Sequence, residues 1–427
     1  MKLWDKGYTT ENIVERFTVG NDRVLDLKLA KFDVQGNAAH AKMLAKIGIL
    51  TKQELADILK GLDEIGQTIE DGTFTIENDF EDVHSKIEFE LVKKIGEAGK
   101  KIHTARSRND QVLVDLHLYA KDEIIQIKGL IKTLFETLID LAERHKKVLL
   151  PGYTHMQIAM PSSFGLWFGA YAESLIDDMI MMNAAFKIAD QNPLGSAAGY
   201  GSSFPIDRTM TTELLGFETM KYNVVAAQMS RGKLERSISY GLASVAGTLS
   251  KFSADVCLFM SQNFNFIGFP KELTTGSSIM PHKQNPDVFE LMRAKCNQIQ
   301  SLPVEISYII NNLTSGYHRD FQQLKESIMN GIDQLKDNLE VCNFMLRHIK
   351  VNENILDSDM YDYLYSVEEV NKLVMSGMPF REAYQKLGKD IMEGNYKPEK
   401  NVKHTHEGSI GNLCLEEIKS KMSDVMK

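Results

Sequence analysis

Long stretches with apolar residues at helical spacing limit the fold of this chain more than any other feature. The clearest runs from Val112 to about Lys147, where apolar residues recur every three or four positions. At about 1.5 Å per residue, such a helix measures roughly 50 Å. Four more long helices are expected at Ser162 to Gln191, Ser237 to Phe264, Pro286 onward past Pro303, and Gln322 to His348.

Two of these helices carry further expectations. The stretch from Ser237 to Phe264 is apolar or small nearly all round, so we expect it to be buried at the centre of a bundle. The helix that begins at Pro286 contains Pro303, where a kink is expected. Five long helices joined by longer loops indicate an elongated helix bundle.

The composition agrees with a helical fold, because only 10 Pro and 29 Gly occur among 427 residues. Before Arg106 and after about Val351, the predicted helices are shorter and more interrupted. We therefore predict an all-α, three-domain subunit. An N-terminal helical domain spans 1–110, a central long-helix bundle 111–350, and a C-terminal helical domain 351–427.

The charges and cysteines limit the partners and the cellular location that this protein can have. The formal net charge is -9, and Lys and Arg are scattered among acids, which argues against a nucleic-acid-binding surface. The four cysteines lie far apart, which suggests neither a disulfide framework nor a zinc site. The N-terminal stretch has acids where a signal peptide needs apolar residues, and no later segment offers about 18 consecutive apolar residues. We expect a soluble, cytoplasmic protein with neither nucleic acid nor membrane as a partner.

The loop "TTGSSIMPHKQNPDVFELMRAK", from Thr274 to Lys295, combines small residues with a helix start. Asn285 is placed as the N-cap and Pro286 in the first helical position. Together with Lys283, the positive end of that helix is suited to hold a carboxylate or phosphate. The alternative is an ordinary loop before a well-capped helix.

A histidine stands in a second irregular stretch, "PGYTHMQIAMP", from Pro151 to Pro161. His155 follows Thr154 in a polar turn, where an imidazole is suited to proton transfer near neutral pH. Glu290 is a candidate to orient it, as a carboxylate does in a catalytic triad. A structural or solvated histidine is the alternative.

Two polar clusters lie at the starts of long helices. "HTARSRNDQV" and "SGYHRDFQQLKE" supply Arg forks for carboxylates and amides for directional hydrogen bonds. A capping turn and a solvated helix face are the respective alternatives. The clusters contain Arg106, Arg108, Asn109 and Gln111, and Tyr317, Arg319, Gln322 and Lys325.

The motifs that are missing narrow the chemistry further. The sequence has no Gly-rich phosphate loop, no dinucleotide fingerprint and no metal-ligand spacing. We therefore predict a reaction without a metal, nucleotide or redox cofactor, and acid–base chemistry is what remains.

Taken together, the loop from Thr274, the stretch "PGYTHMQIAMP" and the cluster "HTARSRNDQV" resemble the fumarase/aspartase superfamily. Its hallmark Gly-Ser-Ser-x-Met-Pro-x-Lys-x-Asn-Pro loop reads from Gly276 to Pro286 here. "TARSRNDQV", "PGYTHMQ", "NPLGSAAGYGSSFPIDR", "YHRDFQQLKE" and "PFREAYQKLG" are similar to the argininosuccinate lyases within that superfamily. The resemblance extends from "EDVHSKIE" near Glu81 to about Gly388.

The resemblance implies a homotetramer with each active site assembled from three subunits. It also implies the reversible β-elimination of argininosuccinate to L-arginine and fumarate through an aci-carboxylate. By position in the motif, Ser277 is the candidate base, and Lys283 and Asn285 would stabilise the carbanion. His155, with Thr154 and Glu290, would protonate the departing nitrogen, or the same pair would supply the base instead.

The same comparison implies which residues hold the substrate. They are Ser107, Arg108, Asn109, Asn285, Tyr317, Gln322, Lys325, Arg231 and Asp33. Two departures stand out: a Ser is common in the family around the position of Asp22, and Arg231 is followed by Gly232 where an Asp is usual. An N-acylated argininosuccinate as substrate, another fumarate-releasing lyase and a non-catalytic δ-crystallin-like protein are the alternatives.

Overall fold

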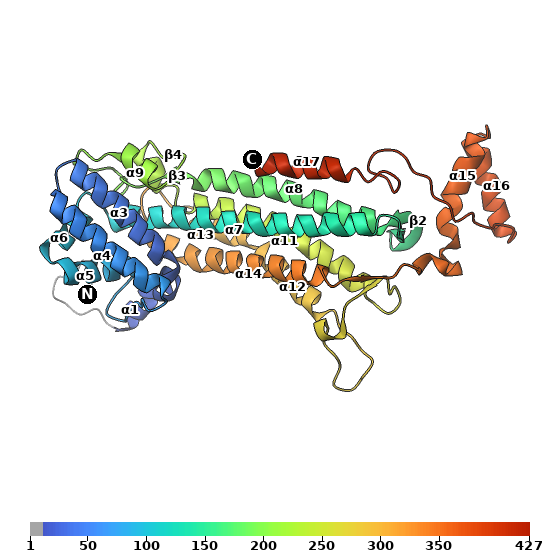
Figure 1. The fold of residues 1–427 in the computed structure, drawn as a ribbon, viewed down its shortest axis with the longest axis horizontal. Coiled ribbons are helices and arrows are strands. Elements are labelled where there is room, and N and C mark those ends of the chain that lie inside the picture. The colour runs from blue at the N-terminus through green and yellow to red at the C-terminus, as the bar shows by residue number, and fades with distance from the viewer. Residues whose placement is uncertain (1–11) are drawn as a thin grey trace. The chain divides into compact units, whose positions relative to one another are not determined.

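The computed structural model describes residues 12–427 and is mostly helical, which confirms the predicted fold class (Figure 1). The helices are α1 Asn12–Val19, α2 Asp22–Leu25, α3 Ala30–Lys46, α4 Lys52–Glu70, α5 Val83–Ile95, α6 Glu97–Lys100, α7 Arg108–Arg144, α8 Phe164–Ala189, α9 Arg208–Leu214, α10 Val224–Gln228, α11 Lys233–Phe259, α12 Asp287–Ile299, α13 Leu302–Ile310, α14 Gln323–Leu346, α15 Ser366–Met375, α16 Phe380–Met392 and α17 Leu415–Met426.

Within residues 12–427, six short strands accompany the helices in three pairs. The antiparallel pair β1 and β2 comprises Leu149–Thr154 and Gln157–Ser163. The other pairs have two residues per strand: β3 (Gln191–Asn192) with β4 (Thr219–Met220), and β5 (Ile267–Gly268) with β6 (Lys350–Val351).

The chain forms two compact units, each built from three segments. The first contains the described part of Met1–Lys128 with Met181–Ser244 and Gln298–Leu335. The second contains Gly129–Ile180, Val245–Asn297 and Lys336–Lys427. The segments interleave because the long helices α7, α8, α11 and α14 each begin in one unit and end in the other. The three consecutive domains expected from the sequence stay a prediction.

In the first unit, α3, α4 and α5 pack around buried apolar side chains that include Leu44, Ile58 and Ile87. Local sequence signals start these helices. Thr51 forms a capping box with Glu54 at the start of α4, and its hydroxyl accepts from the Glu54 N–H at 3.1 Å. Asp82 caps α5 in a similar way, because its carboxylate accepts from the Ser85 N–H at 2.8 Å.

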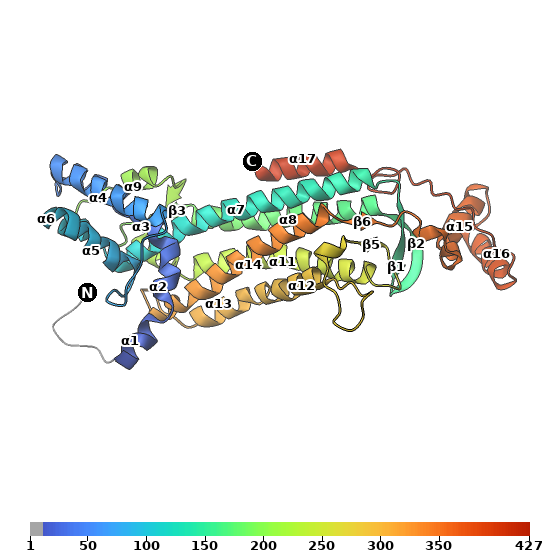
Figure 2. The same ribbon diagram turned by 60° about the horizontal axis from the view of Figure 1, so that its bottom comes forward.

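In the second unit, segments of α7, α8, α11 and α14 run side by side (Figure 1 and Figure 2). Their facing side chains are apolar and aromatic. The Trp167 ring of α8 stacks on the Phe252 ring of α11 with centroids 5.3 Å apart, and Phe252 in turn meets Phe289 of α12. A smaller core of Val370, Ala383 and Leu387 joins α15 to α16.

The kinked helix expected at Pro303 is wrong. The first helix, α12, ends at Ile299, and a separate helix, α13, begins at Leu302 with Pro303 in its first turn. Proline has no N–H and is tolerated in a first turn, where that donor would have no intrahelical partner. The proline therefore starts a new helix and does not bend a continuous one.

The helix expected to be buried all round, α11, is buried on one face in this subunit. Leu242, Val245 and Leu249 are buried, whereas Tyr240 is 50% exposed and several small residues between them are half-buried. Among the described residues, α11 is also the one helix long and apolar enough to span a membrane, a criterion that core helices of soluble proteins also meet. The expectation of burial on every side is wrong for the single subunit.

The stretch around His155 is a β-hairpin and not the irregular stretch expected from the sequence. Thr154 pairs with Gln157, so His155 and Met156 form a two-residue turn with φ of 52° and 59°. Both central residues of such turns need positive φ, which Asn-Gly or Asp-Gly usually supplies. His-Met carries no such signal, and the hairpin was missed.

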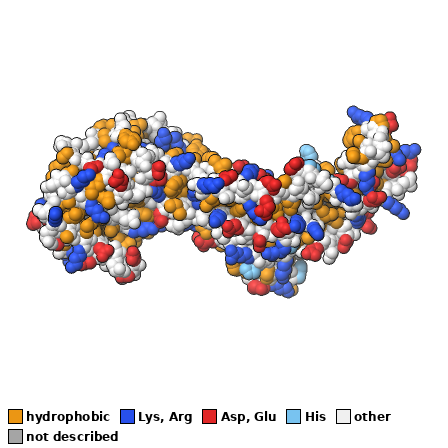
Figure 3. All heavy atoms as spheres, turned by 45° about the horizontal axis from the view of Figure 1, so that its top comes forward, with side chains coloured by type: hydrophobic (Ala, Val, Ile, Leu, Met, Phe, Trp, Pro, Cys, Tyr) orange, Lys and Arg blue, Asp and Glu red, His pale blue; other side chains and the backbone are white. Residues whose placement is uncertain are grey.

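On the face shown in Figure 3, Lys and Arg side chains are interspersed with Asp and Glu. This distribution resembles the scattered charges of the sequence.

Candidate active site

A pocket of about 210 Å³ in the first unit collects most of the predicted substrate-binding residues. Arg108 and Asn109 reach it from the first turn of α7, because this helix begins at Arg108 and not at Val112 as expected. The other predicted lining residues are Arg231, Tyr317, Gln322 and Lys325.

Several acids share this pocket with the cations. Glu81 and Asp82 lie just before α5, in the "EDVH" motif that the resemblance included without assigning it a role. The Arg108 guanidinium lies 2.9 Å from Asp82 Oδ2, and Arg319 Nη2 lies 2.8 Å from Glu81 Oε1. The arginines are therefore held in place by carboxylates. In the sequence, the "EDVH" motif was the one indication that Glu81 and Asp82 belong to the site.

Lys325 is 4% exposed and contacts two carboxylates. Its Nζ lies 2.7 Å from both Asp22 Oδ1 and Asp26 Oδ1. Burial lowers the pKa of Lys325, but the charges of Asp26 and Asp22 outweigh burial and raise it. Lys325 is therefore a charged ammonium in the pocket.

At the departure Arg231-Gly232, both residues donate to the same carboxylate, that of Glu235. Glu235 on α11 accepts from the Arg231 Nε at 2.8 Å and from the Gly232 N–H at 2.6 Å. The other side of Arg231 donates to the Phe321 carbonyl at 2.8 Å. Arg231 and Glu235 are both buried, so their ion pair orients the guanidinium.

Gly232 itself has no room for a side chain. Its φ is +82°, and a Cβ would lie 2.8 Å from Ile310 Cγ2 and 3.2 Å from Phe321 Cε1. We expect Gly232→Ala to lower the free energy of unfolding by roughly 2–4 kcal/mol, which combines left-handed backbone strain with overpacking. Urea unfolding measures this change. Gly216→Ala is the control, because Gly216 has φ +66° and open space, and an equal loss in both variants would contradict the steric contribution.

Gln322 lines the pocket, and Ser107 lies just before α7. The Gln322 amide donates to the Thr18 carbonyl at 2.8 Å and accepts from Arg319 Nε at 3.1 Å. The Ser107 hydroxyl accepts from the Asn109 N–H at 3.3 Å and is not among the residues that line the pocket. Both were predicted to hold substrate, and in this structure their hydrogen bonds go to the protein.

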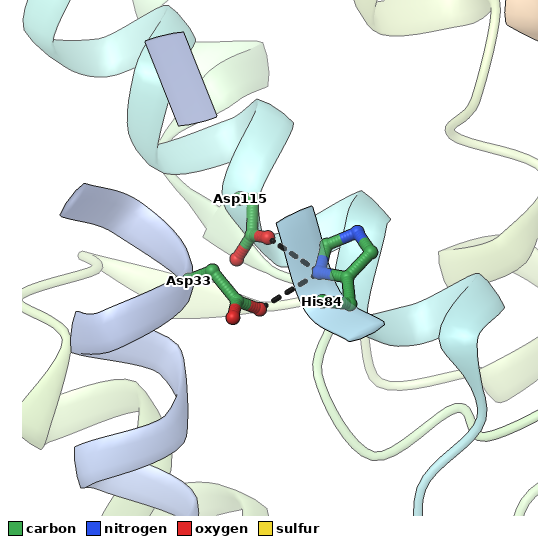
Figure 4. A group of neighbouring side chains, drawn as sticks. All are labelled: Asp33, His84 and Asp115. Carbon is green, nitrogen blue, oxygen red and sulfur yellow. Dashed lines mark hydrogen bonds and ion pairs between the residues drawn. The ribbon is translucent and has the colours of Figure 1, made fainter. Parts of the chain in front are cut away.

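Asp33 is fully buried and is not among the residues that line the pocket, so its predicted contact with substrate stays a prediction. Figure 4 shows its carboxylate and that of Asp115 pointing toward the His84 imidazole. His84 Nδ1 lies 2.8 Å from Asp33 Oδ1 and 3.5 Å from Asp115 Oδ2. His84 does line the pocket, so Asp33 acts one layer behind the wall, as a support for His84.

The protonation of this cluster follows from burial and pairing. Burial alone would raise the pKa of Asp33, but the charge of His84 and its hydrogen bond lower it. Burial and the neighbouring Asp33 raise the pKa of Asp115 well above its ordinary value. Burial lowers the pKa of His84, but Asp33 outweighs burial and raises it. Pairing with His84 thus favours the charged form of Asp33, whereas burial and Asp33 favour the neutral form of Asp115.

Asp33, His84 and Asp115 are also the one group of three metal-type ligands among the described residues. The Asp33 oxygens, however, already accept hydrogen bonds from Gln111 Nε2 at 2.7 Å and Asn37 Nδ2 at 2.8 Å. Each Asp33 oxygen therefore already accepts one hydrogen bond from a side-chain amide of the protein.

The predicted catalytic loop lies in the second unit. The half-buried Ser277 Oγ accepts from the Met280 N–H at 3.1 Å and from the Ile279 N–H at 3.3 Å. Asn285 does not cap α12 as expected, because the Pro286 carbonyl accepts the first helical hydrogen bonds, from Phe289 at 2.9 Å. The Asn285 side chain donates to the Gly276 carbonyl at 3.3 Å instead, and this closes the loop.

The other predicted catalytic side chains are exposed. Thr154 and His155 lie at the β1–β2 turn, Lys283 lies in the loop, and Glu290 lies in the first turn of α12. Among the described residues, none of these four side chains has a hydrogen-bond partner in this subunit. Pairing between His155 and Glu290 is therefore absent within the described part of one chain and stays a prediction.

Comparisons with known proteins identify the family of this chain. The model of a lyase family matches residues 7–301. An argininosuccinate lyase of Bacteroides fragilis is 58% identical over 99% of this chain and 94% of that protein. An argininosuccinate lyase of Thermotoga neapolitana is 41% identical over 90% of this chain and 96% of that protein.

Among solved structures, a variant of EDDS lyase with bound fumarate has a TM-score of 0.77 at 20% identity, covering 99% of this chain and 90% of that one. A fumarate lyase of Brucella melitensis has a TM-score of 0.73 at 16% identity, covering 98% of this chain and 93% of that one. At these identities the likeness shows the fold alone. From the near full-length sequence matches, this chain belongs to the argininosuccinate lyase family of carbon–nitrogen lyases.

Proposed function

We propose that this protein catalyses the reversible β-elimination of argininosuccinate to L-arginine and fumarate. The observation that carries the proposal is the pocket of the first unit. Its arginines and Lys325 suit the carboxylates of such a substrate, and its acids suit the ammonium and guanidinium groups. No cofactor is needed, because the reaction moves a proton and breaks one C–N bond.

The proposed base is Ser277. Removal of a proton beside a carboxylate builds a doubly negative aci-carboxylate, and a serine hydroxyl is a weak base unless its alkoxide is stabilised. Two backbone N–H groups already donate to Ser277 Oγ, at 3.1 and 3.3 Å. Lys283 lies six residues further along the same loop and supplies a positive charge, and Asn285 holds the loop closed.

The proposed acid is His155, assisted by Thr154 and oriented by Glu290. It would protonate the guanidinium nitrogen that leaves the succinyl carbon. The reverse assignment, with His155 as the base, uses the same residues. The two assignments differ in which residue removes the substrate proton. Exchange of that proton with deuterium oxide, measured in variants of Ser277 and His155, distinguishes them.

The assembly is part of the proposal. We infer a homotetramer in which each active site takes residues from three subunits. Two features support it: the exposed positions of His155 and Glu290, and the face of α11 that one subunit leaves half-buried. A cytoplasmic location fits the four cysteines, which are all free thiols, as in reducing compartments.

A direct assay tests the function. We expect fumarate, followed by its ultraviolet absorbance, to be released from argininosuccinate and not from adenylosuccinate, aspartate or malate. Fumarate from one of those three alone would favour another superfamily lyase. A folded protein that releases none from any of the four would favour a non-catalytic, crystallin-like role.

A further inference from the structure

In the pocket of the first unit, two carboxylates face one ammonium group. Lys325 Nζ lies 2.7 Å from Oδ1 of both Asp22 and Asp26. The Asp26 side chain is fully buried, and its second oxygen accepts from the Val83 N–H at 3.3 Å. Asp26 is therefore fully engaged within the protein.

Asp22 is engaged on one side only. Its side chain is 16% exposed and lines the pocket, and among the described residues no group donates to Oδ2. The other pocket cations have carboxylate partners of their own: Arg108 with Asp82, Arg319 with Glu81, and Arg231 with Glu235. When both acids are ionised, the group of Asp22, Asp26 and Lys325 carries one net negative charge, and among the described residues no cation other than Lys325 forms an ion pair with Asp22.

We propose that Asp22 determines specificity for the amino-acid half of the substrate, because its carboxylate binds a free α-ammonium group and so excludes an Nα-acylated substrate. The inference rests on the proposed function and concerns the same pocket. Acylation removes the positive charge of the ammonium group and leaves Asp22 Oδ2 without a donor in a partly buried site, which such sites reject strongly. Asp22 lies where a Ser is common in the family, one of the two departures noted in the sequence.

The electrostatics of Asp22 agree with an unfilled cation position. Burial, helped by the negative charge of Asp26, raises the pKa of Asp22 to about 6. The positive charges of Lys325 and Arg231 lower this pKa but do not outweigh burial. Protonated Asp22 has no charge for an ammonium group. The KM for argininosuccinate should therefore rise as the pH falls through about 6, and this rise should be absent when residue 22 is neutral.

The test compares Asp22→Asn with the wild type on argininosuccinate and Nα-acetylargininosuccinate. We expect the wild type to prefer the free amine by about 100-fold in kcat/KM, and Asp22→Asn to reduce that preference about tenfold or more, chiefly through KM. Asp22→Glu should restore part of it. Asp333→Asn, which removes an ion pair with Lys28 outside the pocket, should keep the wild-type preference.

An unchanged substrate preference in Asp22→Asn, with wild-type stability in urea, would overturn the inference. So would a wild type that cleaves the acetylated substrate as well as the free amine. If the wild type releases no fumarate at all, the proposed function fails separately. Calorimetric binding of L-arginine and Nα-acetyl-L-arginine to both proteins then gives the same comparison, and an equal ratio of affinities overturns the role of Asp22.

Discussion

Ser277→Ala is expected to lower kcat for argininosuccinate cleavage by about 10²–10⁴-fold, the usual contribution of a positioned proton-transfer group. Ser277 Oγ is the one side-chain oxygen in the described loop that accepts from two of the loop's own backbone N–H groups, those of Met280 and Ile279. Removing it deletes the proposed base and leaves those two donors without their acceptor. KM should change far less than kcat, because the pocket of the first unit is untouched.

Ser278→Ala is the matched control. Ser278 is the next residue of the same loop and is exposed. We expect it to retain most of the wild-type kcat. Both variants should unfold at wild-type urea concentrations, since Ser277 lies in a loop and contributes no apolar burial. Near wild-type turnover in Ser277→Ala would remove this residue from the mechanism.

His155→Asn is expected to cause a loss of similar size, about 10²–10⁴-fold in kcat. Asn occupies a similar volume and tolerates the positive φ that His155 adopts at 52°, so the hairpin should persist. His348→Asn, a change at an exposed histidine at the end of α14, serves as the control and should keep full activity.

The two variants together also decide which group is the base. In deuterium oxide, a variant that keeps the base exchanges the substrate C–H even when C–N cleavage is slow. If Ser277 is the base, His155→Asn should retain exchange and Ser277→Ala should lose it. The opposite pattern would assign the base to His155 and contradict the proposed roles.

Much of the fold was predictable because helix periodicity is a local property. The stretch from Val112 onward predicted α7, and the observed helix differs by a few residues at each end. The errors lie where local signals mislead or are missing. Pro303 starts a helix and does not kink one, and the His155-Met156 turn lacks the residues that usually mark a hairpin.

The sequence motifs predicted which residues belong to the candidate site, but not which of them contact one another. Arg108, Asn109, Tyr317 and Lys325 do line one pocket. The sequence could not show that Asp33 is buried behind His84, that Gln322 is bonded to the Thr18 carbonyl, or that Glu235 supports Arg231. Each of these facts depends on which side chains the packed helices bring within hydrogen-bond distance.

By itself, the sequence determined the helical class, the motifs of the family and the residue types available for acid–base chemistry. The tertiary structure alone decided which charges meet. Asp26 and Lys325 stand 299 positions apart in the chain and are 2.7 Å apart in the structure. Burial then sets the charge that each group carries, because desolvation depends on the surrounding atoms and not on neighbours in sequence. For that reason the surplus carboxylate of Asp22 became visible only in the folded chain.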